Sequence, residues 1–294
     1  MFPGVVRMGY GIILAPIGDA AAGRSAMAAA MLVGRAFGAH VDVLHVRADP
    51  RQIIPYVGEG LSGALVDEVI SAAANDGGRR ELEARALFDE YCESKVVPIA
   101  SAPQPGFSMA WRVDDGREDE RAAMWARTAD LAVASRPLAA AEAQTTALFE
   151  GLVYEGGLPV LLSPPTPPKS IGKRILIGWN GGAECARAIA SAMPFLEAAE
   201  AIRVVSMPGW LDGLSRIERV RDRLAWRGIA AEAKACPGEA PVEIGRNLLA
   251  AASDFDADLI VMGAYTQSRI RQMVLGGVTR HAVSNAECAL FLER

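Results

Sequence analysis

The same short pattern, an aspartate followed by an apolar run, occurs near the middle and near the end of the chain. It reads DLAVAS at 130–135 and DLIVMG at 258–263. Upstream of each copy lies another matched apolar run. YGIILAPI at 10–17 is followed by Gly18, and RILIGW at 174–179 is followed by Asn-Gly-Gly at 180–182. Continuous apolar runs of this length, bounded by glycine, are typical of strands buried on both faces of a parallel sheet. The repeat therefore predicts two copies of one α/β unit.

Helix-favouring segments separate the predicted strands. In the first unit an alanine-rich segment at 20–39 leads into HVDVLHV at 40–46, and in the second unit 184–198 leads into IRVVSM at 202–207. Strand, helix and strand in this order predict a parallel βαβ unit. The expected fold class is therefore α/β, with two tandem, open, mostly parallel, five-stranded domains.

Residues 47–95 interrupt the repeat and are expected to form a helical insertion in the first domain. The apolar spacing predicts two helices, with the Asn-Asp-Gly-Gly segment at 75–78 as the stop between them. In the second of these helices, the spacing of Leu82, Ala86 and Tyr91 indicates side chains that are buried together.

The boundary between the two domains is predicted at PPTPPKS, residues 164–170. A segment so rich in proline continues neither a helix nor a sheet, and it forms a stiff, extended spacer. The expected domains are 1–165 and 171–294. Their last strands, 159–163 and 288–293, are expected to pack together as an intramolecular pseudo-dimer, because open apolar edges promote aggregation. The insertion offers a further surface for a homodimer.

The composition indicates the class of protein and its partners. Of the 294 residues, 51% are apolar and 22% are charged, which is typical of a globular protein with a sizeable core. The net charge of −5 gives no electrostatic reason to expect nucleic acid or an anionic membrane as partner. No apolar run reaches the roughly 18 residues of a transmembrane helix, and the N-terminus lacks the apolar core of a signal peptide. We therefore expect a cytoplasmic protein.

The cysteine pattern and the polar residues give no sign of metal or nucleophilic chemistry. The four cysteines are scattered, with no CxxC pair and no neighbouring histidine. This argues against a zinc site and predicts reduced, mostly buried thiols. No Ser–His–Asp order and no Walker loop is present, so no catalytic residue and no metal ligand is predicted.

The most informative stretch for a ligand follows the last repeated strand. DLIVMG ends at Gly263, and a loop then leads to Gly276-Gly277-Val278-Thr279 at the start of a final predicted helix. Glycine lets backbone N–H groups approach an anion closely, and a helix start favours negative charge. Strand, glycine, loop, glycine pair and helix together predict a site for an anionic ligand.

With this loop and the repeat, the chain resembles the universal stress protein family in its tandem form, most strongly from about Lys173 to Arg294. The resemblance implies an adenine nucleotide alpha hydrolase-like, Rossmann-like three-layer fold and ATP, with Mg²⁺, as the ligand. In the family pattern Gly-x2-Gly-x9-Gly, Gly263 takes the first position, Thr266 stands at the second and Gly276 takes the third. The resemblance also assigns nucleotide contacts to Asn180, Gly181, Ser206, Met207, Gly277, Val278 and Thr279.

Three residues depart from the family pattern. Thr266 has a β-branched side chain where glycine is expected, which costs about 1–3 kcal/mol if a positive φ is required. Gly277 lacks the hydroxyl of the expected Ser or Thr, a loss of about 1 kcal/mol. Asn180 replaces an acidic residue and keeps its hydrogen bonding without the charge. In the first domain Arg136-Pro137 follows DLAVAS where glycine is expected, so that domain is not expected to bind nucleotide.

Two functions remain open from the sequence. In the first, the chain is a stress-response protein whose second domain binds an adenine nucleotide. In the second, it is a nucleotide-free interaction protein that keeps the fold and acts by pairing, as Thr266, Gly277 and the altered first-domain loop suggest. Neither function requires catalysis; an enzyme is the third alternative, and it would be at most a slow ATPase.

Overall fold

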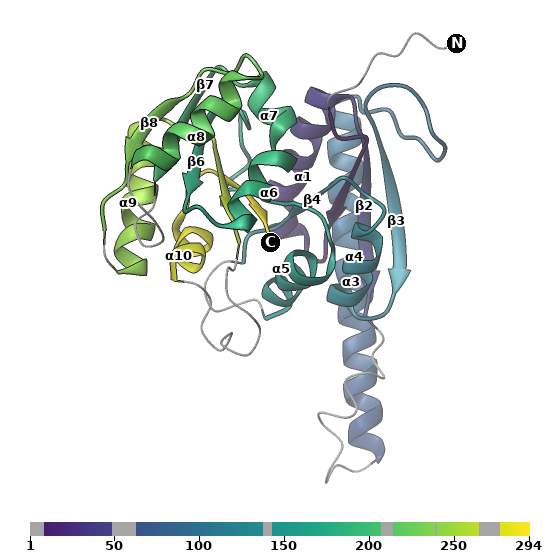
Figure 1. The fold of residues 1–294 in the computed structure, drawn as a ribbon. Helices are drawn as coiled ribbons and strands as arrows, with labels where there is room; N and C mark the ends of the chain where they lie inside the picture. Colours follow the sequence, from purple (N-terminus) through teal and green to yellow (C-terminus); the bar gives the residue numbers. More distant parts are fainter. Residues whose placement is uncertain (1–8, 49–62, 138–142, 207–213, 239, 265–276) are drawn as a thin grey trace.

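The computed structural model describes residues 9–48, 63–137, 143–206, 214–238, 240–264 and 277–294. Within them, ten strands form one open sheet (Figure 1). In chain order the strands are β1 (Ile12–Pro16), β2 (His40–Arg47), β3 (Ser108–Asp115), β4 (Leu131–Ala134), β5 (Val160–Leu162), β6 (Arg174–Trp179), β7 (Ala201–Ser206), β8 (Glu232–Ala235), β9 (Leu259–Gly263) and β10 (Ala289–Glu293).

The sheet joins the two halves of the chain, residues 9–163 and 172–294, without a break. Its strand order is β3-β2-β1-β4-β5-β10-β9-β6-β7-β8. Neighbouring strands are parallel except for β5 and β10, which pair antiparallel with Leu290 opposite Leu162. The predicted mostly parallel, open α/β sheet is confirmed, and so is the predicted contact between the last strands of the two halves.

Helices cover both faces of the sheet and give three layers (Figure 1). Helices α1, α3, α6, α7 and α8 pack on one face, and α4, α5, α9 and α10 pack on the other. Within the described residues, no helix has both the length and the apolar character needed to cross a membrane. The helices are α1 (Ala20–Phe37), α3 (Gly63–Ser94), α4 (Glu118–Ala126), α5 (Ala143–Glu155), α6 (Ala183–Ser191), α7 (Met193–Ala198), α8 (Leu214–Ala225), α9 (Pro241–Asp254) and α10 (Gly277–Asn285).

The aspartate that opens each repeated apolar run anchors the strand beside it. The Asp130 carboxylate accepts hydrogen bonds from the backbone N–H groups of Gly11 and Ile12, at 2.7 and 2.9 Å. Asp258 does the same for Gly172 and Arg174, both at 3.0 Å. In each half the start of the first strand is therefore held to the start of the fourth, which explains why this aspartate recurs.

Helix α1 shows how local residues set the limits of an element. Asp19 precedes it in extended conformation, and its Oδ1 accepts hydrogen bonds from the N–H groups of Ala21 and Ala22 at 2.8 and 3.0 Å. At the other end Gly38 takes a left-handed conformation with φ of 64°. A side-chain cap at the start and a left-handed glycine at the end are strong boundary signals.

The predicted break at 75–78 is wrong, because α3 runs through it as one helix of 32 residues. Neither glycine of this segment has a positive φ, so the backbone continues as a helix. Ion pairs that span the segment favour this: Arg79 pairs with Asp76 at 2.6 Å and with Glu83 at 2.8 Å. Pairs three or four residues apart stabilise a helix, and they oppose the low propensity of glycine.

The packing of α3 also differs from the prediction. Leu82 is 74% exposed and Ala86 is exposed, whereas Tyr91 is buried as expected. The face that packs against the core carries Leu87 and Phe88 instead. The first part of α3 extends beyond the rest of the molecule (Figure 1), so the sheet sets which face is buried only near the C-terminal end of the helix.

A cluster of aromatic rings crosses the junction of the two halves on one face of the sheet. The ring of Phe195 lies 5.6 Å from that of Tyr10, 5.0 Å from that of Phe37 and 6.0 Å from that of Phe291. The Tyr10 hydroxyl donates a hydrogen bond to the Ser191 carbonyl at 2.7 Å, and burial raises the pKa of this phenol. Edge-to-face rings and a satisfied hydroxyl make this contact specific as well as apolar.

A continuous α3 predicts that alanine is better than glycine at its centre. Nothing lies within 4 Å of a β-carbon placed on Gly77 or on Gly78. The double variant Gly77→Ala/Gly78→Ala should raise the free energy of unfolding by about 1–2 kcal/mol, because alanine has the higher helix propensity. Urea unfolding followed by circular dichroism measures the change.

The matched control is Gly38→Ala, which places a β-carbon at a positive φ and should destabilise the protein by about 1 kcal/mol. A double variant in α3 that unfolds as easily as Gly38→Ala would contradict a continuous helix.

Candidate functional site

The order of the strands in the second half reverses beside β6. The chain runs from β6 outward to β7 and β8, and it then returns through α9 to β9 on the other side of β6. In open α/β sheets, ligands bind in the crevice at such a reversal, outside the carboxyl ends of the strands. Four predicted site residues lie at these strand ends or at the start of α10, and we call this region the second-half edge: Asn180, Ser206, Gly263 and Gly277.

Asn180 forms a tight turn between β6 and α6. Its side-chain Oδ1 accepts a hydrogen bond from the N–H group of Gly182 at 2.8 Å, and Gly181 between them has a φ of 79°. Asparagine favours such turns because its side chain reaches the backbone two residues onward. With Oδ1 used in the turn, the amide Nδ2 is the group that Asn180 can offer to a ligand as a donor.

Gly263 is required by the packing of α6 on the end of β9. A β-carbon placed on Gly263 would lie 2.6 Å from the backbone nitrogen of Cys185 and 2.8 Å from the Glu184 β-carbon. The N–H group of Gly263 donates to the Cys185 sulfur at 3.4 Å, and the Cys185 thiol donates to the Gly178 carbonyl at 3.4 Å. The absence of a side chain at this position therefore has a structural reason, independent of any ligand.

Gly277 is required by contact with the start of α9. A β-carbon placed on Gly277 would lie 2.6 Å from the Pro241 β-carbon. The two helices remain close further along, where a β-carbon on Gly245 would lie 2.8 Å from that of His281. The sequence alone suggested that Gly277 had lost a useful hydroxyl. In the structure, a serine or threonine at this position would collide with Pro241.

The other predicted contacts divide into buried side chains and residues outside the described ranges. Thr279 is buried and Val278 packs against the core, so at the start of α10 the backbone N–H groups are the donors available to a ligand. The predictions for Met207, Thr266 and Gly276 lie outside the residues that the structure describes.

The strand order of the first half also reverses, between β1 and β4. There, however, side chains of the first half occupy the space at the carboxyl ends of the strands. The pairing register gives these counterparts: Gly18 for Asn180, His45 for Ser206, and Arg136 for Ala264. His45 is buried, with its Nδ1 2.9 Å from the Ile17 carbonyl oxygen and its ring stacked at 6.0 Å on Trp111. A small polar residue at the second-half edge thus corresponds to a packed aromatic pair in the first half.

A carboxylate occupies the space next to Gly18. A β-carbon placed on Gly18 would overlap the Glu118 carboxylate. Burial raises the pKa of Glu118 to about 7; Arg80 opposes this shift, and Asp119 and Asp19 add to it. This residue, which the sequence analysis did not single out, lies at the first-half position that matches the turn of Asn180.

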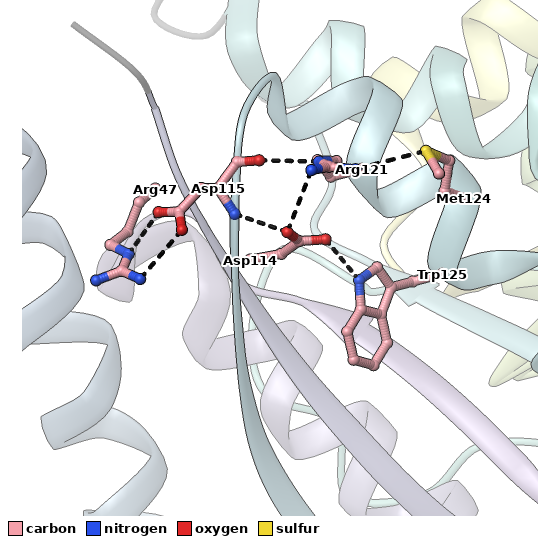
Figure 2. Close-up of polar contacts among 6 residues, drawn as sticks. All are labelled: Arg47, Asp114, Asp115, Arg121, Met124 and Trp125. Carbon is pink, nitrogen blue, oxygen red and sulfur yellow. Dashed lines mark hydrogen bonds and ion pairs between the residues drawn. The ribbon is translucent and has the colours of Figure 1, made fainter.

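Ion pairs and hydrogen bonds close the same side of the first half at the ends of β2 and β3 (Figure 2). Asp115 pairs with Arg47 at 2.8 Å, and its carbonyl accepts a hydrogen bond from Arg121 Nε at 2.8 Å. Asp114 accepts a hydrogen bond from Trp125 Nε1 at 2.9 Å, which holds the pKa of that carboxyl below its usual value. These acidic groups are thus engaged with neighbouring side chains. Within the described ranges, no three His, Cys, Asp or Glu residues are placed to hold a metal ion.

Comparison with known proteins agrees with this geometry. Residues 172–292 match the model of the universal stress protein family. A universal stress protein structure from Archaeoglobus fulgidus DSM 4304 is similar with a TM-score of 0.68 at 12% identity, over 96% of this chain and 98% of that chain. A functionally unknown protein from Pseudomonas aeruginosa PAO1 has a TM-score of 0.54 at 16% identity, over 97% and 92% of the two chains. No curated protein matches the sequence. At these identities the structural likeness shows a shared fold.

The contact between Gly277 and Pro241 predicts a coupled pair. Gly277→Ala alone should destabilise the protein by about 1–3 kcal/mol, because the added methyl group overlaps Pro241 in a packed region. In the background of Pro241→Gly, which removes the clashing carbon, the same substitution should cost less by at least about 0.5 kcal/mol. Urea unfolding of the four proteins of the cycle measures the coupling, and strict additivity would contradict the contact.

The raised pKa of Glu118 predicts that stability falls as pH rises. A folded pKa of about 7, against the ordinary value of 4.5, means that the folded state holds an extra proton between these values. Glu118 therefore disfavours folding progressively from about pH 4.5 to pH 7, by up to about 3 kcal/mol. Glu118→Gln keeps this position neutral, so its stability should decline less across this window. Urea midpoints from pH 5 to pH 8 provide the measurement.

The matched control is Glu120→Gln, an exposed carboxylate in the first turn of the same helix. It should keep the slope of the native protein, and a Glu118→Gln profile parallel to the native one would contradict the prediction.

Proposed function

Because residues 172–292 match the model of the universal stress protein family, we propose that this half binds an adenine nucleotide, ATP with Mg²⁺, at the second-half edge. The observation that carries the proposal is the reversal of strand order between β6 and β9. The end of β6 leads there into the turn of Asn180, β9 ends beside it at Gly263, and α10 begins at the same edge. Such a crevice is the usual ligand position in folds of this class.

The described residues at this edge carry the kinds of hydrogen-bonding groups that a nucleotide needs. Asn180 Nδ2 would donate to a ribose hydroxyl, because its Oδ1 is engaged by Gly182. The N–H groups at the start of α10 would face the phosphates, since a helix start carries unpaired donors and a partial positive charge. Ser206 would line the end of β7 with its hydroxyl. The protein would then exist in a nucleotide-bound and a nucleotide-free form, and a stress-response function would depend on which form is present.

A second candidate function is a nucleotide-free protein that acts by pairing. The observation that favours it is that two glycines of the predicted site, Gly263 and Gly277, are explained by the packing of neighbouring helices. Gly263 makes room for Cys185 and Glu184, and Gly277 makes room for Pro241. Glycine at these positions would be kept even if no ligand were bound.

Calorimetric titration with ATP and Mg²⁺ separates the two functions. The first predicts saturable binding with a dissociation constant below about 1 mM, the weakest affinity that such a titration readily measures. Asn180→Ala should weaken binding by roughly five- to tenfold, equivalent to a lost hydrogen bond of about 1 kcal/mol. Asn180→Asp keeps an acceptor for Gly182 and should bind at least as well as Asn180→Ala.

The matched control is Asn285→Ala, which removes another asparagine whose side chain bonds the backbone, at the His281 carbonyl and at the end of α10 opposite Gly277. It should bind as the native protein does. No binding by correctly folded native protein up to millimolar ATP would reject the first function and leave the pairing function.

A further inference from the structure

Arg136 follows β4 in the first half, but its side chain ends among backbone carbonyls of the second half. It is 3% exposed. Its Nη1 donates to the Val283 carbonyl at 2.7 Å, and its Nη2 donates to the Cys288 carbonyl at 2.8 Å. Its Nε donates to the Ser163 carbonyl at 3.1 Å, just after β5. One guanidinium therefore connects the end of β5, the last turn of α10 and the entry to β10.

The contact with α10 is a helix cap supplied from the other half of the chain. Nη1 also lies 3.4 Å from the Ala282 carbonyl, which already accepts a hydrogen bond from the Ala286 N–H group at 2.9 Å, so the Val283 carbonyl is the one that Arg136 caps. The last carbonyls of a helix have no partner within the helix, and a cation favours the negative end of its dipole. The Arg136 guanidinium donates a hydrogen bond to such a carbonyl and also places a positive charge at the negative end of the helix dipole.

The charge of Arg136 is met mainly by backbone carbonyl oxygens, and the nearby Glu287 carboxylate also favours it. Within the described part of the chain, no ion pair includes this side chain, whose hydrogen bonds are to carbonyl oxygens. Burial lowers its pKa to about 10, so it remains protonated at neutral pH. A buried charge is costly unless its donors are all satisfied. The arrangement therefore depends on α10 being held in one position against the β5–β10 junction.

The cap by Arg136 has no counterpart at the matching position, although Arg294 of the second half lies 4.8 Å from the ring of Tyr154 near the end of α5. The counterpart of Arg136 in the second half is Ala264, whose methyl group cannot reach α5, the counterpart of α10. The first half thus braces a helix of the second half, and the reverse contact does not exist at this position.

Helix α10 connects this brace to the second-half edge. It has nine residues, with Gly277 at the ligand end and the Arg136 contacts near the other. Helices of this length move as rigid units, so a displacement at one end is transmitted to the other. We propose that Arg136 is a positioning residue that holds α10, and that the ligand affinity of the second half therefore depends on the first half. The effect on affinity rests on the proposed nucleotide function, whereas the brace itself does not.

The test uses the full-length chain and two readouts. Arg136→Met keeps an unbranched apolar stem and removes the guanidinium, with its charge and its donors. Without nucleotide, hydrogen–deuterium exchange should become about tenfold faster in the amides of α10 and stay near native in β6 and β7. The dissociation constant for ATP with Mg²⁺, measured by calorimetry, should rise by about the same factor. Arg136→Lys keeps the cation with fewer donors and should fall between native and Arg136→Met in both readouts.

The matched control is Arg127→Met. Arg127 Nε donates at 3.3 Å to the Glu155 carbonyl at the end of α5, so it contacts a helix end within the first half alone. It should leave the exchange of α10 and the ATP affinity at native values.

Each outcome decides between the two proposals. Native exchange in α10 of Arg136→Met would overturn the brace, and so would faster exchange that is equal throughout the sheet. Faster exchange confined to α10 with unchanged ATP affinity would overturn the dependence of the ligand site on the first half. If the native protein binds no ATP, the nucleotide function fails, and exchange alone then decides whether Arg136 braces α10.

Discussion

The antiparallel pairing of β5 with β10 is the contact on which the rest of the structure depends. Each strand would otherwise be the exposed, apolar edge of a parallel five-stranded sheet, with unpaired backbone groups. Joined, all their side chains except that of Glu293 are buried. Both faces of the junction are then closed by groups from the two halves, the ring of Tyr10 on Phe195 on one face and Arg136 on the carbonyls of α10 on the other. The two halves therefore share one sheet, and side chains of each half contact the other half.

The two halves share the same backbone arrangement, but the residues at the strand reversal differ between them. Both reverse strand order between their first and fourth strands, the place where such sheets bind ligands. In the second half this place carries the turn of Asn180, the end of β9 and the start of α10. In the first half it carries the Glu118 carboxylate beside Gly18 and a buried His45 stacked on Trp111. One copy of a duplicated fold is thus arranged for internal contacts, and the other retains an edge suited to a ligand.

The glycines illustrate why a motif has to be interpreted with the structure. From the sequence, Gly263 and Gly277 mark a backbone that approaches a phosphate. In the structure each also leaves room for a neighbouring element, α6 at Gly263 and Pro241 at Gly277. A glycine in the sequence shows only that no side chain is present at that position. Which neighbour needs that space is a property of packing between segments far apart in the chain.

The sequence by itself determined the α/β class, the parallel strands and the pairing of the two last strands, because these follow from apolar periodicity, glycine and proline positions and an internal repeat. It also assigned Asn180, Ser206, Gly263 and Gly277 to one candidate site, through the glycine pattern and the family resemblance; the structure has three of them at the carboxyl ends of neighbouring strands and Gly277 at the start of α10. Only the tertiary structure decided that α3 continues through 75–78, that Glu118 lies against Gly18 and that Arg136 caps a helix of the other half. Local patterns set elements and their order, whereas burial, ion pairs and cap contacts depend on side chains from distant segments that meet only when the sheet has formed.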